Sequence, residues 1–214
     1  IKRGVPVVIG EAEGPVMEVF QDAALGQEAP LYPASQWVRT GRAVHLSGNP
    51  PLLVTDLQFG DEPWLRRIST PLTGHYQVEN QRTAYCALRV LQQALPVSPG
   101  AILKGFREVR DLTGLRGRWE ILCEKPLVIA DTAHNEEGMR LVMQQWMEVQ
   151  ASERHVVIGM VDDKDPGAIL THLPRDARYY FCKPDVPRGM EALRLQAHAG
   201  AAGLYGAAYP SVIQ

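Results

Sequence analysis

The sequence predicts an α/β protein whose C-terminal half contains a mostly parallel sheet covered by helices. In that half, short apolar runs alternate with longer helical patterns, an order typical of parallel strands joined by helical crossovers. In the N-terminal half, several β-rich runs precede a long helical pattern. Between the halves, the segment 112–118 (LTGLRGR) holds two glycines and two arginines, and the composition changes there. We therefore expect two domains, residues 1–115 and 116–214.

Apolar spacing and turn residues define the elements expected in the N-terminal domain. Strands are expected at 5–9, 30–35, 43–46, 52–57 and 64–69, and helices at 15–25, after the loop 70–77, and at 98–109. The middle helix is long, because its helical pattern is interrupted only at Pro96. Its predicted buried stripe comprises Ala84, Leu88, Leu91 and Leu95.

The same reasoning gives the elements of the C-terminal domain. Strands are expected at 119–123, 127–130, 155–161, 178–182 and near Leu204, and helices at 135–149, 166–173 and 188–198. The run 127–130 (LVIA) is apolar throughout, which favours a buried strand of the parallel sheet. For the helix that follows, the predicted buried stripe comprises Met139, Val142, Trp146 and Val149.

Composition excludes several function classes. The chain has 214 residues, of which 45% are apolar and 21% charged, and a net charge of -2 gives no electrostatic argument for nucleic acid or an anionic membrane as a partner. We expect neither a signal peptide at the start nor a membrane segment in the glycine-interrupted final residues. Cys86, Cys123 and Cys182 form no C-x-x-C pair, so we expect reduced core cysteines in a cytoplasmic protein, without cysteine-bound zinc.

Several familiar catalytic motifs are absent from the sequence. None of the five lysines is followed by Ser or Thr, so the chain has no G-x-x-x-x-G-K-[ST] phosphate loop. It also lacks the G-x-G-x-x-G dinucleotide motif, the H-E-x-x-H zinc motif and the G-x-S-x-G nucleophile elbow.

The best candidate site is the segment 131–135 (DTAHN), where the strand 127–130 passes into a helix. The carboxyl ends of parallel strands collect ligands, and a helix N-terminus favours anionic groups. Asp131 could accept hydrogen bonds from ribose hydroxyls or orient a cation, with His134 and Asn135 near phosphates. The alternative is structural, with Asp131 or Asn135 capping the helix and His134 half-buried at the surface.

Three further segments carry a functional and a structural interpretation. Arg118, next to the domain boundary, could reach a nucleotide with its guanidinium, or it could be a solvated linker residue. The segment Gly74–Asn80 places His75, Gln77 and Asn80 at the start of the long helix, where capping is the alternative. The acidic loop Asp162–Asp165 follows an expected strand, and its alternative is an ordinary charged loop.

Five motifs in a consistent order resemble one family. They are IKRGVPVVIGE at 1–11, TPLTGHYQVENQRTA at 70–84, GRWE at 117–120, LVIADTAHN at 127–135 and GMVDDKD at 159–165. Together they resemble the bifunctional folylpolyglutamate synthase/dihydrofolate synthases of the Mur ligase superfamily. The resemblance implies that residues 1–115 are the second half of a central ATPase domain. Residues 116–214 would then be a Rossmann-like C-terminal ligase domain, truncated at its end.

The resemblance implies an ATP site with contributions from Asn80, Arg118 and Asp131. These positions match family residues of the ATPase domain, the linker and the C-terminal domain, respectively. The family's phosphate loop, its Mg²⁺ ligands, its modified lysine and its pterin-binding loops would all precede Ile1. No metal ligand is therefore expected within the chain itself.

The resemblance also implies residues near the incoming amino acid. His134 and Lys164 are the implied catalytic residues, and Asn135 lines the same cleft beside the nucleotide. Thr132 departs from the Gly or Val that the family often has there, a change not expected to abolish nucleotide binding.

The implied activity is ATP-dependent formation of an amide between L-glutamate and dihydropteroate or a folyl-γ-glutamate, through an acyl phosphate. We expect a cytoplasmic monomer whose residues 1–214 alone have negligible ligase activity. Two alternatives remain, namely another Mur-type amino-acid ligase and a non-catalytic nucleotide-binding module.

Overall fold

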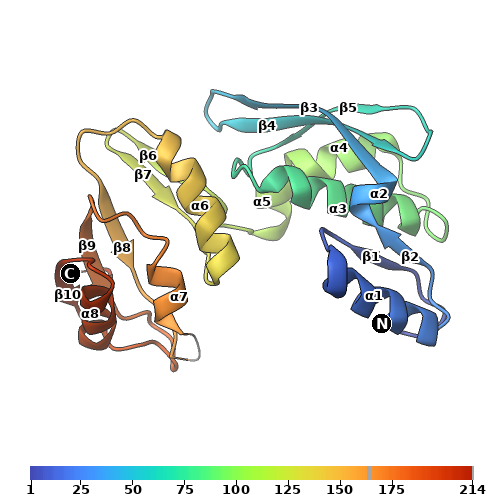
Figure 1. Ribbon diagram of the computed structural model, residues 1–214. Coiled ribbons are helices and arrows are strands. Elements are labelled where there is room, and N and C mark those ends of the chain that lie inside the picture. The colour runs from blue at the N-terminus through green and yellow to red at the C-terminus, as the bar shows by residue number, and fades with distance from the viewer. Residues whose placement is uncertain (163–164, 214) are drawn as a thin grey trace. The chain divides into compact units, whose positions relative to one another are not determined.

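The computed structural model describes residues 1–162 and 165–213, which form two compact units, Ile1–Ala130 and Asp131–Gln214. Figure 1 shows the elements of each unit, coloured along the chain. The units divide after Ala130, whereas the sequence predicted a domain boundary after residue 115. A division into compact units does not define the boundary between two domains, so the boundary after residue 115 stays a prediction.

The first unit contains the N-terminal elements and a hairpin. In chain order they are β1 (Val7–Ile9), α1 (Gly14–Gly26), β2 (Leu31–Pro33), α2 (Ala34–Trp37), β3 (Val38–Leu46), β4 (Leu52–Phe59), β5 (Leu65–Thr70), α3 (Gln77–Leu91), α4 (Pro99–Arg107), α5 (Val109–Thr113), β6 (Glu120–Glu124) and β7 (Leu127–Ala130). Strands β1 and β2 pair in parallel, β3, β4 and β5 form an antiparallel sheet, and β6 and β7 form an antiparallel hairpin.

Helices α2, α3 and α4 pack against the β3-β4-β5 sheet. The core between them contains Ala34, Val38, Leu57, Ile68, Tyr85, Cys86 and Ile102. Strand β4 alternates between buried and half-buried residues, and its inward positions include Leu53, Thr55 and Leu57. This sheet holds the start of α3 on its inner face.

The stripe predicted for α3 was wrong except at Leu88, which packs against the core. Leu91 is exposed at its end, and the residues that α3 buries are Gln77, Gln81, Tyr85, Cys86 and Val90. The Oγ1 atom of Thr55 donates a 2.6 Å hydrogen bond to Oε1 of Gln81. This bond satisfies Oε1 of the buried Gln81 side chain on the polar face of α3 that lies toward the sheet. Apolar spacing alone could not predict that rotation.

The second unit contains α6 (Glu136–Glu148), β8 (His155–Ile158), α7 (Pro166–Leu170), β9 (Arg178–Cys182), α8 (Ala192–Ala201) and β10 (Gly206–Tyr209). Its sheet has the order β10-β9-β8, and both pairs of strands are parallel. Tyr179 and Phe181 of β9 belong to a core that includes Leu170 of α7 and Leu195 of α8. Gly206 lies opposite Tyr179, where a Cβ atom would come within 1.9 Å of the Tyr179 carbonyl oxygen, so this position requires glycine.

Two expectations about the hairpin were wrong. The run 127–130 does form a strand, but it pairs with β6 in antiparallel fashion, and Leu127 and Val128 are 47% and 41% exposed. A short apolar run does not define its partner strand, so it was assigned to the parallel sheet. Cys123 lies on the same hairpin and is exposed, unlike the buried Cys86 and Cys182.

Most other C-terminal elements were confirmed, with ends that differ by up to four residues, as at the start of α8. Strand β9 has the predicted bounds, and α6 is one residue shorter at each end than predicted. Helix α6 buries Met139 and Val142 as expected, with Gln145 in place of Trp146. Within the described residues, no helix has the length and apolarity needed to cross a bilayer.

Candidate functional site

The linker 114–120 is held in a tight conformation by Glu120. Gly117 and Trp119 have positive φ angles of 67° and 50°. The Glu120 side chain is buried, its Oε2 accepts a 2.8 Å hydrogen bond from the Gly117 amide, and its Oε1 lies 2.6 Å from Nη2 of Arg116. The Gly117 amide, followed by Arg116, holds the pKa of this carboxyl below its usual range although burial opposes the shift. Glu120 is therefore a buried carboxylate with defined partners.

Arg118 lies within the segment 117–120, whose ends the Glu120 side chain joins. It is half-buried, and its Nη1 donates a 3.1 Å hydrogen bond to the carbonyl oxygen of Gly117. The following residue, Trp119, is buried, and its carbonyl oxygen accepts a 3.3 Å hydrogen bond from Oγ1 of Thr73. The linker is thereby joined to the loop that leads into α3. The alternative of a freely solvated Arg118 does not fit these contacts.

The loop before α3 is equally well connected. Nε2 of His45 on β3 lies 3.0 Å from the carbonyl oxygen of Thr73, and the rings of His45 and His75 have centroids 4.9 Å apart. Since a carbonyl oxygen only accepts, His45 donates in this bond. These contacts fix the start of α3 against the antiparallel sheet.

Asn80 lies in the first turns of α3. Its Nδ2 donates a 3.2 Å hydrogen bond to Oε1 of Gln77, which is buried. The N-cap of α3 is Tyr76, which makes no capping hydrogen bond through its side chain. Neither Gln77 nor Asn80 is therefore the N-cap residue of α3.

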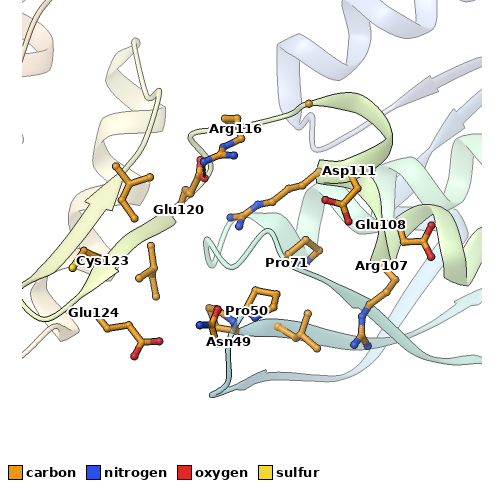
Figure 2. Close-up of a pocket in the computed structure, with 16 residues that line it drawn as sticks. Asn49, Pro50, Pro71, Arg107, Glu108, Asp111, Arg116, Glu120, Cys123 and Glu124 are labelled. Carbon is orange, nitrogen blue, oxygen red and sulfur yellow. Dashed lines mark ion pairs between the residues drawn. The ribbon is translucent and has the colours of Figure 1, made fainter.

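A groove of about 1030 Å³ lies within the first unit (Figure 2). It is bounded by the β3–β4 turn, Pro71, the segment from α4 to the linker, and β6. Its walls carry side chains of both charges. The basic ones are Arg107, Arg110 and Arg116, and the acidic ones are Glu108, Asp111, Glu120 and Glu124. Figure 2 shows Arg116 and Glu120 meeting at one end. None of the predicted site residues is among the described residues that line this groove.

The segment 131–135 opens the second unit, and its side chains bond to their own backbone. Oδ1 of Asp131 accepts a 2.8 Å hydrogen bond from the Ala133 amide, and Nδ1 of His134 lies 3.1 Å from the carbonyl oxygen of Thr132. The N-cap of α6 is Asn135, whose Oδ1 accepts a 2.8 Å hydrogen bond from the Gly138 amide. Asn135 therefore has the structural role that the sequence left open, and Asp131 does not cap the helix.

The charge at the start of α6 is negative. Glu136 and Glu137 occupy its first turn, where carboxylates stabilise the helix dipole but oppose a second anion. Glu137 bonds with Nε of Arg140 at 2.8 Å, and this contact lowers the pKa of its carboxyl. The expectation that His134 and Asn135 lie near phosphates stays a prediction.

The acidic loop after β8 is partly described. Oδ1 of Asp162 accepts a 2.7 Å bond from Nη1 of Arg194, and Asp165 caps α7 through the Gly167 amide at 2.9 Å. Lys164, a predicted catalytic residue, lies outside the described residues. Asp162 and Asp165 have structural partners, which fits the charged-loop alternative.

The predicted nucleotide residues are divided between the units. Asn80 and Arg118 belong to the first unit. Within this unit, Thr73 in the loop before α3 binds the Trp119 carbonyl of the linker. Asp131, His134 and Asn135 belong to the second. Sequence reasoning did not single out Thr73 or Glu120, although both lie in the motifs quoted for the resemblance. Within the described residues, no group of three or more His, Cys, Asp or Glu residues is placed to hold a metal ion.

Comparison with known proteins gives consistent matches. Residues 117–213 match the family described as Mur ligase, glutamate ligase domain. The dihydrofolate synthase/folylpolyglutamate synthase of Escherichia coli K12 is 35% identical over 123 residues, which are 56% of this chain and 28% of that protein. The folylpolyglutamate synthase of Lacticaseibacillus casei is 28% identical over 198 residues, covering 89% of this chain and 44% of that protein.

A solved structure extends the similarity to the whole fold. The E. coli FolC in complex with DHPP and ADP has a TM-score of 0.76 and 27% identity, over 100% of this chain and 46% of that chain. The chain thus spans less than half the length of each of these relatives.

Proposed function

We propose that the chain, whose residues 117–213 match the Mur ligase glutamate ligase domain, forms part of an ATP-dependent amide ligase. The ligase would join L-glutamate to dihydropteroate, to a folyl-γ-glutamate, or to both. The observation that carries the proposal is the family match, which begins at the linker around Arg118. The E. coli and L. casei relatives, both named folate ligases, support the choice of acceptor.

The reaction has two steps. A carboxylate oxygen of the acceptor attacks the γ-phosphorus of ATP, and ADP leaves with the electrons of the broken bond. The amine of glutamate then attacks the acyl carbon, loses a proton, and displaces inorganic phosphate. The first step needs cationic groups because charge develops on the transferring phosphoryl group.

We assign nucleotide contacts to three residues. Arg118 suits a phosphate, because a guanidinium binds phosphate oxygens bidentately and the linker contacts fix its backbone. The carboxylate of Asp131 suits ribose hydroxyls, and the amide of Asn80 suits a base or a phosphate oxygen. His134 and Asn135 are assigned to the side of glutamate addition, together with Lys164.

Mg²⁺ at a nucleotide site is usually held by one or two carboxylates together with substrate phosphates and water. Among the described residues, no three or more His, Cys, Asp or Glu side chains are placed to hold a metal ion by themselves. The chain also has no phosphate loop. We therefore assign the groups that hold Mg²⁺ and the β- and γ-phosphates to polypeptide other than these 214 residues.

Free cysteines support a cytoplasmic location, and we further propose a monomer.

Calorimetry tests the nucleotide part of the proposal. Residues 1–214 are expected to bind ADP or ATP, and to release no ADP when glutamate and dihydropteroate are added. Glutamate-dependent ADP release from residues 1–214 would contradict the assignment of the phosphate-binding groups. No heat of nucleotide binding at millimolar concentration would contradict the nucleotide site.

The acceptor is tested in the ligase that contains these residues together with a phosphate loop. Dihydropteroate or a folyl-γ-glutamate is expected to support ADP release with glutamate, and UDP-muramyl substrates are not. The reverse preference would assign the protein to the cell-wall ligases of the same family.

A further inference from the structure

The backbone on both sides of Arg118 has an unusual conformation. Gly117 has a φ angle of 67°, which glycine adopts readily, and Trp119 has a φ angle of 50°, which is unfavourable for a bulky residue. Such a conformation persists only where the surrounding contacts determine it. The direction in which the Arg118 side chain leaves the linker therefore depends on contacts made by its neighbours.

Glu120 makes the strongest of these contacts. Glu120 is only 4% exposed, and the two oxygens of its carboxylate bind different parts of the linker. Oε2 accepts from the Gly117 amide at 2.8 Å and Oε1 pairs with Arg116 at 2.6 Å. The carboxylate thus closes a short ring of backbone that contains Arg118. The lowered pKa of the Glu120 carboxyl agrees with this arrangement, and Arg110 contributes to it in addition to Arg116.

The opposite side of the linker has its own anchor. The Trp119 carbonyl accepts from Oγ1 of Thr73, so the peptide between Trp119 and Glu120 is fixed by the loop before α3. Glu120 thus binds the amide of Gly117 on one side of Arg118, and Thr73 binds the carbonyl oxygen of Trp119 on the other side.

We propose that Glu120 is a positioning residue for nucleotide binding, whose carboxylate sets the conformation of the linker from which Arg118 reaches the nucleotide. This inference rests on the proposed function, since Arg118 is the group that would touch the nucleotide. Glu120 itself would make no contact with it. A merely structural role would instead affect stability and leave affinity unchanged in the folded variant.

The test combines affinity and amide exchange in residues 1–214. ADP affinity is measured by calorimetry for the unaltered chain and for E120A, R118A and the double variant. We expect E120A and R118A each to weaken ADP binding about ten-fold or more, and the double variant to be no weaker than R118A alone. Such non-additivity is the signature of one residue acting through another. E124A is the matched control, because Glu124 is exposed on the same strand.

Amide exchange reports on the linker without any ligand. The Gly117 amide is expected to exchange slowly in the unaltered chain and at least ten-fold faster in E120A, with E124A unchanged. If E120A fails to fold, E120Q replaces it, because glutamine keeps an acceptor for Gly117 but removes the charge paired with Arg116. We expect E120Q to have intermediate ADP affinity and intermediate exchange.

Several outcomes would overturn the inference. Additive losses in the double variant, or normal ADP affinity in folded E120A and E120Q, would show that Glu120 does not act through Arg118. Unchanged exchange of the Gly117 amide in E120A would show that the hydrogen bond between this amide and Glu120 does not form in solution. If the unaltered chain binds no ADP, the proposed function fails, and the exchange measurement still decides whether Glu120 fixes the linker.

Discussion

Thr73 and Trp119 are joined by a hydrogen bond across 46 positions of the chain, from the Thr73 hydroxyl to the Trp119 carbonyl at 3.3 Å. The bond links the loop that opens α3 to the linker that carries Arg118. Because Asn80 follows that loop, the same contact relates two of the proposed nucleotide residues within one compact unit.

Loss of the Thr73 hydroxyl is expected to destabilise the first unit. We predict that T73V lowers the free energy of unfolding by about 1 kcal/mol, since a buried hydrogen bond is removed and the Trp119 carbonyl loses a partner. Urea denaturation followed by tryptophan fluorescence measures this change. T73S is expected to restore most of it, and T171V is the control because the Thr171 hydroxyl bonds only within its own turn. Equal stability of T73V and T73S would contradict the prediction.

Replacement of Arg118 should impair the ligase. In the enzyme that contains a phosphate loop, we predict that R118A raises the KM for ATP roughly ten-fold and lowers kcat, because a charge-assisted bond to phosphate is lost. R118K should recover only part of the loss, since an ammonium group cannot bind bidentately. R3A serves as the control, because Arg3 is exposed and pairs with the exposed Glu28. Steady-state kinetics identical to the unaltered enzyme would exclude this role.

Substitutions at Asp131 and Asn135 are expected to separate effects on nucleotide affinity from effects on stability. We predict that N135A destabilises α6 by about 1 kcal/mol through loss of its N-cap and leaves nucleotide affinity nearly unchanged. D131N keeps an acceptor for the Ala133 amide, so it should preserve stability while weakening ADP binding roughly five-fold. Thermal unfolding and calorimetry measure the two effects. The opposite pattern would assign the cap to Asp131.

Acid should remove the contribution of Glu120 to stability. Its folded pKa is lowered, so the stabilisation is present above the unfolded pKa of about 4.3 and is lost as the pH falls through the folded value. We predict that E120Q has a lower Tm than the unaltered chain at pH 7, and that the difference shrinks toward pH 3. E124Q should match the unaltered chain at both. A difference that grows in acid would show the sign to be wrong.

Alkylation should distinguish the three cysteines. Burial raises the pKa of the Cys86 thiol to about 11 and also raises that of Cys182, whereas Cys123 is exposed. At pH 8 only about one in a thousand Cys86 thiols would be thiolate, the reactive form. We predict that iodoacetamide labels Cys123 first, and that C123S removes the early label in mass spectra. In urea all three should react. Equal labelling in the folded protein would contradict the burial.

Much of the local structure could be read from the sequence. The strands at Leu127–Ala130 and Arg178–Cys182 have the predicted bounds, and α6 differs by one residue at each end. These elements depend on apolar spacing, on branched and aromatic residues, and on capping side chains, all of which act between near neighbours. The sequence also indicated the family, because five short motifs follow one another in a fixed order.

The tertiary structure alone decided three other features. It paired β7 with β6 in place of the parallel sheet, turned Gln81 toward Thr55, and closed the Glu120 carboxylate on Gly117 and Arg116. Strand pairing and the burial of polar groups depend on partners distant in the chain, and the hairpin carries no local signal of its neighbour. The motif at 117–120 likewise named Arg118 as a candidate, but only the folded linker showed that the carboxylate two residues later binds Gly117 and Arg116.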